Sequence, residues 1–227
     1  MKKAVVLLSG GLDSTTTLFL ALSRGYKVNC LIFDYGQRHK KEISRAKEIA
    51  SRQGCRYKII KFKLPWPAGV LVDEKTKIPL DRDLRQISKK IPATYVPARN
   101  TIFLSFALSW AEAIGAGAVF IGANSTDYSG YPDCRPKYFS TFRKLAGLAT
   151  KSGPGKPKIK ILTPLAAKSK ARIVRMGKRL GVPFEMTWSC YKGTKYPCRR
   201  CDSCLLRAKG FRQAGMRDPL YEERKGL

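Results

Sequence analysis

The stretch Ser9-Gly10-Gly11-Leu12-Asp13-Ser14 decides the fold that this sequence predicts. Apolar residues 4–8 precede it and residues 15–23 follow it with helical spacing, which indicates a buried strand, a glycine turn and a helix. The glycines allow a tight turn and a close approach of the main chain to a ligand. Because the helix start offers free N–H groups and a positive dipole, the stretch predicts a phosphate-binding loop. The alternative is a simple Gly-Gly turn between strand and helix.

The presence of Asp13 in a phosphate-binding loop has two explanations, because a carboxylate and a phosphate side by side repel each other. Either Mg²⁺ lies between them, or Asp13 caps the helix. The loop lacks the lysine of the nucleoside-triphosphate P-loop and does not follow G-x-G-x-x-G. It resembles instead the S-G-G-x-D-S loop of the PP-loop ATP pyrophosphatases, which holds the pyrophosphate end of ATP. That resemblance implies an ATP site made by Leu8, Ser9, Gly10, Gly11, Leu12, Asp13, Ser14 and Thr15, with Mg²⁺ as a cofactor.

The composition is strongly basic: 45 lysines and arginines stand against 16 acidic residues, for a net charge of +29 over 227 residues. This charge predicts non-specific affinity for RNA or DNA; the alternative is a basic surface in a protein whose ligands are small anions. No familiar nucleic-acid module is present, so nucleic-acid binding is not required. The apolar run after Lys2 and Lys3 is too short for a signal peptide, and none spans a membrane. We expect a cytoplasmic protein without membrane attachment.

Strand and helix patterns alternate along the chain. The apolar spacing predicts strands at 4–8, 27–34, 56–62, 118–123 and 159–162, and helices at 15–23, 39–52, 101–114, 138–149 and 168–180. This order predicts an α/β fold: a doubly wound parallel five-stranded sheet with helices on both faces and ligands at the carboxyl ends of its strands. We expect a catalytic domain at 1–185, with proline-rich 64–94 inserted as a lid or a surface loop, and a C-terminal segment at 186–227.

Four of the seven cysteines lie close together: Cys190, Cys198, Cys201 and Cys204. Their C-x7-C-x2-C-x2-C spacing suits one tetrahedral ion. In a reducing compartment, four thiolates without a histidine favour Zn²⁺, and an iron–sulfur cluster is the alternative. Since four protein ligands leave no open position for water, the expected role is structural, in a small zinc-binding helical appendage. The remaining Cys30, Cys55 and Cys134 are expected to fill core or site-wall positions.

Five stretches resemble the 7-cyano-7-deazaguanine synthases, the QueC family of the PP-loop superfamily. In chain order they are residues 9–14, DYGQRH at 34–39, VPARN at 96–100, GANSTDYSGYPDCRP at 122–136 and TWSCY…CRRCDSCLLR at 187–207. The resemblance spans nearly the whole chain and implies an adenine nucleotide α-hydrolase-like fold. Two residues depart from the family pattern: Lys137 replaces a usually acidic residue, and Arg199 replaces a usual glycine.

The resemblance implies ATP-dependent conversion of 7-carboxy-7-deazaguanine and ammonia to the nitrile, which serves the deazaguanine modification of tRNA (queuosine or archaeosine). Adenylation activates the carboxylate, ammonia gives an amide, and a second activation of the amide oxygen gives the nitrile. Asp13, Arg99 and Lys168 are the implied catalytic residues, and Arg99 suits bidentate contact with an anion. The residues implied in substrate binding are Arg99, Asn100, Asp127, Tyr128, Tyr131, Asp133 and Arg135. His39 either packs against its helix or belongs to the site wall.

Three other functions remain open. The chain could be another PP-loop enzyme that modifies tRNA, or a nucleic-acid-binding module with a vestigial phosphate loop. It could also be a QueC-like enzyme that attaches the deazaguanine acid to DNA, protein or tRNA through an amide, which the departure at Lys137 keeps open. We expect a homodimer.

Overall fold

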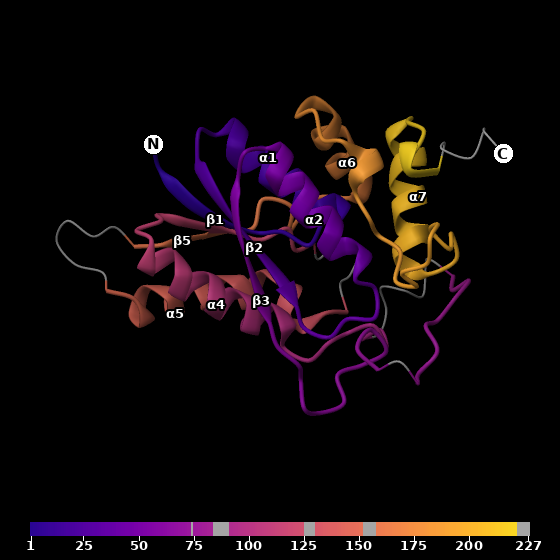
Figure 1. The fold of residues 1–227 in the computed structure, drawn as a ribbon, viewed down its shortest axis with the longest axis horizontal. Helices are drawn as coiled ribbons and strands as arrows, with labels where there is room; N and C mark the ends of the chain where they lie inside the picture. Colours follow the sequence, from indigo (N-terminus) through magenta and orange to yellow (C-terminus); the bar gives the residue numbers. More distant parts are fainter. Residues whose placement is uncertain (74, 84–90, 125–129, 152–157, 222–227) are drawn as a thin grey trace.

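A five-stranded parallel sheet forms the centre of the molecule, as the computed structural model shows (Figure 1). The structure describes residues 1–73, 75–83, 91–124, 130–151 and 158–221. The strands are β1 (Lys3–Leu7), β2 (Lys27–Asp34), β3 (Arg56–Lys61), β4 (Ala118–Phe120) and β5 (Lys160–Leu162), in the spatial order β3-β2-β1-β4-β5. All four neighbouring pairs are parallel, so the predicted sheet is confirmed.

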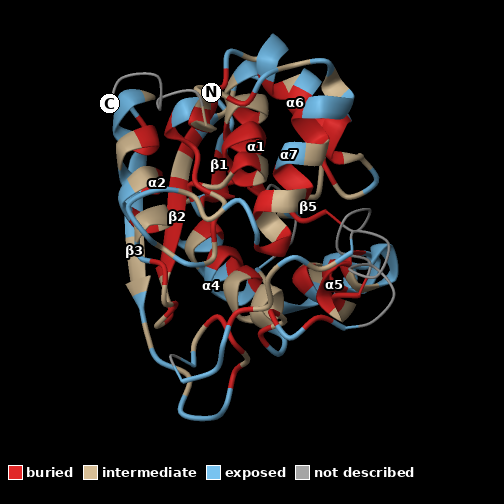
Figure 2. Cartoon of the chain, turned by 90° about the vertical axis from the view of Figure 1, so that its right-hand side faces the viewer, coloured by how far each residue is buried: buried red, intermediate tan, exposed pale blue. Residues whose placement is uncertain are grey.

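Helices cover both faces of this sheet. α1 (Leu12–Ser23) and α2 (Lys41–Arg52) cover one face, and α4 (Arg99–Ala113) and α5 (Pro136–Ala149) cover the other. α6 (Lys170–Arg179) and α7 (Asp202–Ala214) pack against each other and α1; short 3-10 turns occupy Pro132–Cys134, Phe184–Met186 and Pro219–Tyr221. Side chains alternate across β1, so Ala4 and Val6 pack toward α1 and α2, whereas Val5 and Leu7 pack toward α4 and α5. Figures 1 and 2 show these two helix layers and the buried strands between them.

Three helices, α1, α4 and α5, begin earlier than the apolar spacing predicts, and for α1 and α4 the early start has a local cause. Gly11 is extended (ψ 165°) and caps α1, which therefore starts at Leu12 and includes Asp13 in its first turn. The carboxylate of Asp133 accepts the main-chain N–H of Asn100 (2.9 Å), which adds a turn to the start of α4. Both starts bring polar residues to the carboxyl ends of the strands.

The expected insertion at 64–94 is attached to the body of the protein through its described residues. Arg38 donates from Nη1 to the main-chain carbonyl of Thr76 (2.6 Å), and Leu71 is buried. Farther along, Leu80 forms an antiparallel bridge with Cys201. The described part of the insertion therefore contacts both the residues before α2 and the segment of residues 187–207 that carries the four cysteines (the cysteine segment).

The C-terminal segment packs on the sheet domain through α7, which lies against α6. Val174 of α6 and Phe211 of α7 share an apolar cluster with Leu12 of α1. The main-chain N–H of Trp188 donates to the carbonyl of Gly10 (2.9 Å), so the segment also touches the phosphate loop. Within the described ranges, no helix combines the length and the apolar character that crossing a membrane requires.

Candidate active site at the carboxyl ends of the strands

A cavity of about 260 Å³ lies where β1, β2 and β4 end. The turn between β1 and α1 forms one side, and the residues before α2 and α4 form another. The third side comes from the C-terminal segment, with Trp188, Ser189 and Tyr191. Distant parts of the chain therefore meet at the edge of the sheet where parallel α/β proteins bind their ligands.

The phosphate loop contributes most of its residues to this cavity. Its cavity-lining members are Leu8, Ser9, Gly11, Leu12, Asp13 and Ser14. Gly10 lies behind them with φ +77°, and a Cβ there would come within 2.4 Å of the carbonyl oxygen of Glu42. Thr15 is fully buried within α1. Eight consecutive residues were expected at the ATP site, and the structure separates six that face the cavity from two that support them.

The loop hydroxyls are bonded to one another. Ser9 Oγ and Ser14 Oγ lie 3.0 Å apart, and the N–H of Gly11 donates to Ser9 Oγ (3.3 Å). The side chain of Ser14 also accepts the N–H of Ser9 (3.2 Å). These bonds hold the turn in a shape that directs the start of α1 into the cavity, where its free N–H groups suit an anion.

Asp13 does not cap the helix, because its carboxylate forms an ion pair with Lys170. The ammonium nitrogen of Lys170 lies 2.7 Å from Oδ2 and 2.9 Å from Oδ1. Lys170 is buried, and Gly210 makes room for it, since a Cβ on Gly210 would lie 2.3 Å from Lys170 Cγ. This pair places one negative and one positive charge beside the phosphate loop.

The sequence analysis named Lys168 and missed Lys170. Lys168 is half-buried and is not a residue of the cavity wall, and its carbonyl accepts Asn124 Nδ2 (2.9 Å). α6 begins two residues after Lys168, and this first helical turn directs Lys170 toward Asp13. Sequence spacing offered no signal to choose between the two lysines, because the choice depends on where α6 starts.

Arg99 and Asn100 both line the cavity at the start of α4. Arg99 donates from Nη1 to the hydroxyl of Tyr35 (2.9 Å). Asn100 donates from Nδ2 to the carbonyl of Asp133 (3.0 Å) and to Cys134 Sγ (3.2 Å). Arg99 therefore presents a guanidinium to the cavity, while Asn100 connects α4 to the turn at Pro132–Cys134.

The other predicted substrate residues are placed differently. Tyr131 lines the cavity, and its hydroxyl lies 2.8 Å from Thr94 Oγ1. Asp133 is buried behind the wall, where burial raises its pKa and its carboxylate caps α4. Arg135 is exposed and lies outside the cavity wall, as does Lys137. Asp127 and Tyr128 lie outside the described residues.

Cys134 also lines the cavity, and its environment makes it unreactive. Burial, followed by the nearby charge of Asp133, raises the pKa of Cys134 to about 12. The side chain is therefore a neutral thiol near pH 7 and not a nucleophile. This agrees with the expected role of Cys134 as a wall residue, and Cys30 and Cys55 are buried as well.

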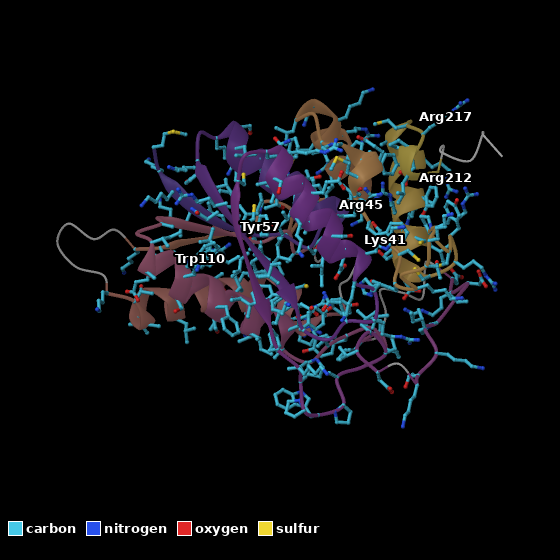
Figure 3. All side chains as sticks on the ribbon, viewed as in Figure 1. Lys41, Arg45, Tyr57, Trp110, Arg212 and Arg217 are labelled. Carbon is cyan, nitrogen blue, oxygen red and sulfur yellow. The ribbon has the colours of Figure 1, made fainter. Side chains whose placement is uncertain are left out.

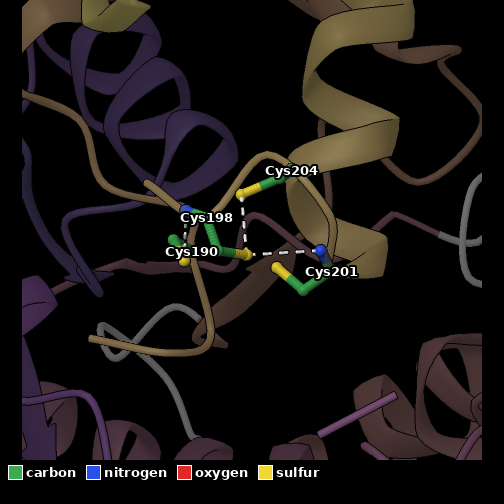
Figure 4. Close-up of side chains that lie close together, drawn as sticks. All are labelled: Cys190, Cys198, Cys201 and Cys204. Atoms are coloured by element: carbon green, nitrogen blue, oxygen red, sulfur yellow. Dashed lines mark hydrogen bonds between the residues drawn. The ribbon is translucent and has the colours of Figure 1, made fainter. Parts of the chain in front are cut away.

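Cys190, Cys198, Cys201 and Cys204 converge beside the cavity (Figure 4). Their ligand atoms all lie within 4.8 Å of one another, close to the separation of about 3.8 Å that a tetrahedral zinc–thiolate site requires. Main-chain N–H groups donate to Cys190 Sγ and Cys198 Sγ (both 3.3 Å), which favours thiolates. The donor set fits a closed zinc site.

Buried and exposed ion pairs surround the cysteine segment. Arg207 is 1% exposed and donates to both carboxylate oxygens of Asp218 (2.6 and 2.8 Å) and to Thr187 Oγ1 (2.7 Å). The buried carboxylate of Asp202, next to Cys201, accepts from Arg82 Nε at 3.0 Å. Polar and sulfur contacts thus add to the small apolar cluster of Ile78, Trp188 and Leu220 in holding this segment.

Basic side chains extend from several elements instead of one arm, as the sequence indicates. Figure 3 labels Lys41 and Arg45 on α2 and Arg212 on α7. Lys41 Nζ lies 4.1 Å from the centre of the Trp188 ring, so part of this charge stabilises the contact between α2 and the cysteine segment.

The family model described as "Queuosine biosynthesis protein QueC" matches residues 3–215. Relatives named 7-cyano-7-deazaguanine synthase are similar over almost their whole length. The one from Thermoplasma acidophilum is 53% identical over 223 residues, which cover 98% of this chain and 93% of the relative. The one from Trichodesmium erythraeum is 49% identical over 220 residues, which cover 96% and 99%.

Solved structures are more distant. A 4-thiouridine synthetase, solved as an RNA complex with bound ATP, is 21% identical and has a TM-score of 0.47, covering 94% of this chain and 50% of that chain. This likeness is too low to bear on the function.

Proposed function

The chain belongs to the QueC family, and on this premise we propose that it converts 7-carboxy-7-deazaguanine, ammonia and ATP to 7-cyano-7-deazaguanine in queuosine biosynthesis. One observation carries the proposal: a phosphate loop, an Asp–Lys pair and an arginine share one cavity in a chain 53% identical to a protein of that name. The reaction class is an ATP-dependent, C–N bond-forming ligation.

The chemistry requires a cavity that binds two anions side by side. A carboxylate resists attack by a nucleophile because it is negatively charged and oxide is a poor leaving group. Transfer of AMP to the carboxylate oxygen removes both obstacles. We assign the departing pyrophosphate to the N–H groups at the start of α1, and the substrate carboxylate to Arg99.

Lys170 takes the role first assigned to Lys168, because Lys170 reaches the phosphate loop. Its ammonium can neutralise charge on the α-phosphate as AMP is transferred. Asp13 is 2.7 Å from this ammonium and is also the carboxylate proposed to hold Mg²⁺ when Mg-ATP binds. Mg²⁺ would supply charge neutralisation of the ATP phosphates.

Binding of the deazaguanine ring is proposed for the wall made by Asn100 and Tyr131. Tyr131 offers an aromatic surface for the ring. Asp127 and Tyr128 stay predicted contacts of the base. Asp133 and Arg135 do not contact the base in this proposal. Asp133 stabilises the start of α4, and Arg135 precedes α5 at the surface.

The remaining predictions concern metal, assembly and location. We propose a structural Zn²⁺ at the four cysteines, and the division into 1–185 and 186–227 stays a prediction. A homodimer and a cytoplasmic location are proposed as ordinary for such an enzyme. Nucleic-acid binding is not part of the reaction, and the net charge of +29 supports only non-specific association.

The test is a product assay by mass spectrometry. Purified protein is mixed with 7-carboxy-7-deazaguanine, ammonium and Mg-ATP. We expect the nitrile together with AMP and pyrophosphate, and loss of all three in Asp13→Ala. Formation of AMP and the amide without the nitrile would instead favour an enzyme that conjugates the acid to a macromolecule. No AMP from folded, zinc-loaded protein would contradict it and favour a tRNA-modifying enzyme.

A further inference from the structure

His39, the single histidine of the chain, lies in the cavity wall just before α2. It is 4% exposed, and its Nε2 lies 3.2 Å from Oε2 of Glu42. Glu42 lines the same cavity. His39 is therefore a residue of the cavity wall whose imidazole is bonded to a carboxylate of the same wall.

Glu42 is itself fixed by a buried amide. Gln37 donates from Nε2 to Glu42 Oε1 (3.4 Å) and to the carbonyl of Phe33 (3.0 Å), and its Oε1 accepts the N–H of Tyr35 (2.8 Å). Because the end of β2 holds this amide, the carboxylate has a fixed orientation. A carboxylate on Nε2 holds the proton on that nitrogen and leaves the lone pair on Nδ1.

Nδ1 of His39 has no hydrogen-bond partner. Among the buried side-chain nitrogens and oxygens that the structure describes, only Nδ1 of His39 and Oγ1 of Thr15 lack one. An unpartnered buried acceptor costs free energy unless a ligand meets it. Since His39 lines the cavity, a substrate that donates a hydrogen bond is the fitting partner.

The surroundings of His39 place it near the proposed carboxylate site. Burial lowers the pKa of His39, but the charge and the hydrogen bond of Glu42 raise it, and the net pKa is raised. The charge of Arg99 acts in the lowering direction, so Arg99 also lies within electrostatic reach of the imidazole. Gly193 of the cysteine segment packs directly against His39, because a Cβ at Gly193 would lie 2.9 Å from His39 Cβ. The ring of Tyr191 lies 5.9 Å away.

We propose that His39, oriented by Glu42, is the proton acceptor for the nitrogen chemistry of this cavity; this rests on the proposed function. Ammonium first gives one proton to Nδ1, which passes it on to solvent, and the resulting ammonia attacks the adenylated carboxyl carbon. Nδ1 then accepts a second proton from the –NH₃⁺ group of the adduct, so that the amide is neutral. The N–C bond forms, the C–O bond to AMP breaks with its electron pair on AMP, and the amide remains.

The same acceptor serves the second half of the reaction. The amide oxygen attacks the α-phosphorus of a second ATP and releases pyrophosphate. One N–H proton passes to Nδ1 and leaves a neutral adenylated imidate. Loss of the second N–H proton forms the C≡N bond as the C–O bond breaks and AMP departs. Two protons leave the nitrogen in this half, and no oxidant or reductant is required.

The experiment separates activation of the acid from the ammonia steps. Exchange of labelled pyrophosphate into ATP, with the acid and without ammonium, reports adenylation alone. Amide and nitrile formation with ammonium report the nitrogen steps. Hydroxylamine is unprotonated near neutral pH, so its capture of the adenylate as a hydroxamate does not depend on a proton acceptor.

The variants are His39→Gln, which keeps a donor for Glu42, and Glu42→Gln, with Glu48→Gln as the matched control on the exposed part of α2. In His39→Gln we expect pyrophosphate exchange and hydroxamate formation within about threefold of wild type, and ammonium-dependent products reduced about 10²-fold or more. Glu42→Gln should reduce only the ammonium-dependent products, about tenfold. Glu48→Gln should change nothing.

Two results would overturn the proposal. One is full ammonium-dependent activity in His39→Gln. The other is parallel loss of exchange, hydroxamate and nitrile in both variants while bound zinc and melting temperature are unchanged, which would make the pair part of substrate binding. If wild type itself shows no acid-dependent exchange, the proposed function fails instead, and the two failures are distinct.

Discussion

Two walls of the same cavity are built by opposite means. The wall at Ser9–Ser14 continues a strand and a helix whose residues Val5, Val6 and Leu18 are fully buried, so apolar packing holds it. The wall at residues 187–207 has only a small apolar cluster around Trp188, and it depends in addition on four cysteines and on the Arg207–Asp218 pair. A core tolerates the loss of a ligand, whereas a loop that depends on polar pairs and on the proposed Zn²⁺ does not. The comparison indicates which half of the site fails first.

Removal of the metal should have the largest effect. A strong chelator is expected to abolish nitrile formation, because structural zinc sites contribute on the order of 10 kcal/mol of apparent free energy to the segment they hold. Hydrogen exchange should rise over residues 187–207 while β1 and β2 stay protected. Equal loss of protection in both walls would show that they fold as one unit.

Gly10→Ala should destabilise the wall at Ser9–Ser14, which apolar packing holds in place. The new Cβ would lie 2.4 Å from the carbonyl of Glu42 at a residue with φ +77°, so we expect a loss of about 3 kcal/mol or more in the free energy of unfolding. Denaturant unfolding measures it. Gly25→Ala is the matched control: φ is +74°, nothing lies within 4 Å, and only about 1–2 kcal/mol of backbone strain is expected. Equal losses would refute the role of close packing at Gly10.

Arg207→Met tests the polar wall without touching a cysteine. It leaves Asp218 buried and unpaired, which should lower the free energy of unfolding by about 3–5 kcal/mol. Arg200→Met removes the pair with Asp81, whose two side chains are more than half exposed, and should change the free energy of unfolding far less than Arg207→Met does. A small effect at Arg207 would mean that the metal alone holds this wall.

Cysteine labelling is expected to show the smallest effect, and it compares the buried Cys134 with the four cysteines of the proposed metal site. Burial holds the pKa of Cys134 at about 12, so alkylation by iodoacetamide should be negligible near neutral pH and increase as pH rises toward that value. After chelation, the four metal-site cysteines should react first. Peptide mapping by mass spectrometry reads each site, and early alkylation of Cys134 would contradict its burial.

Arg199 shows how a departure from the family pattern is accommodated. It adopts φ +61°, a conformation that glycine takes without strain, and its guanidinium lies 5.0 Å from the centre of the Tyr221 ring. Lys137 is exposed in the first turn of α5 and does not line the cavity. Neither departure alters the described wall of the site.

The sequence by itself determined the sheet, the phosphate loop and the cysteine cluster. Each of these features depends on short-range spacing. Apolar runs determine the strands, and Gly10 and Gly11 allow the turn. Spacers of two residues let neighbouring cysteines reach one ion. Local geometry follows from local spacing because backbone dihedrals and strand or helix periods operate over a few residues.

Only the tertiary structure decided which charged groups meet. Lys170 reaches Asp13 across 157 positions of sequence, and the neighbouring candidate Lys168 does not reach the cavity. Arg99 likewise meets Tyr35, 64 positions away. Such pairs depend on where a helix starts and how distant elements pack, and no spacing rule encodes either. The surroundings of His39 have the same origin, since Gly193 and Arg99 come near it from other parts of the chain.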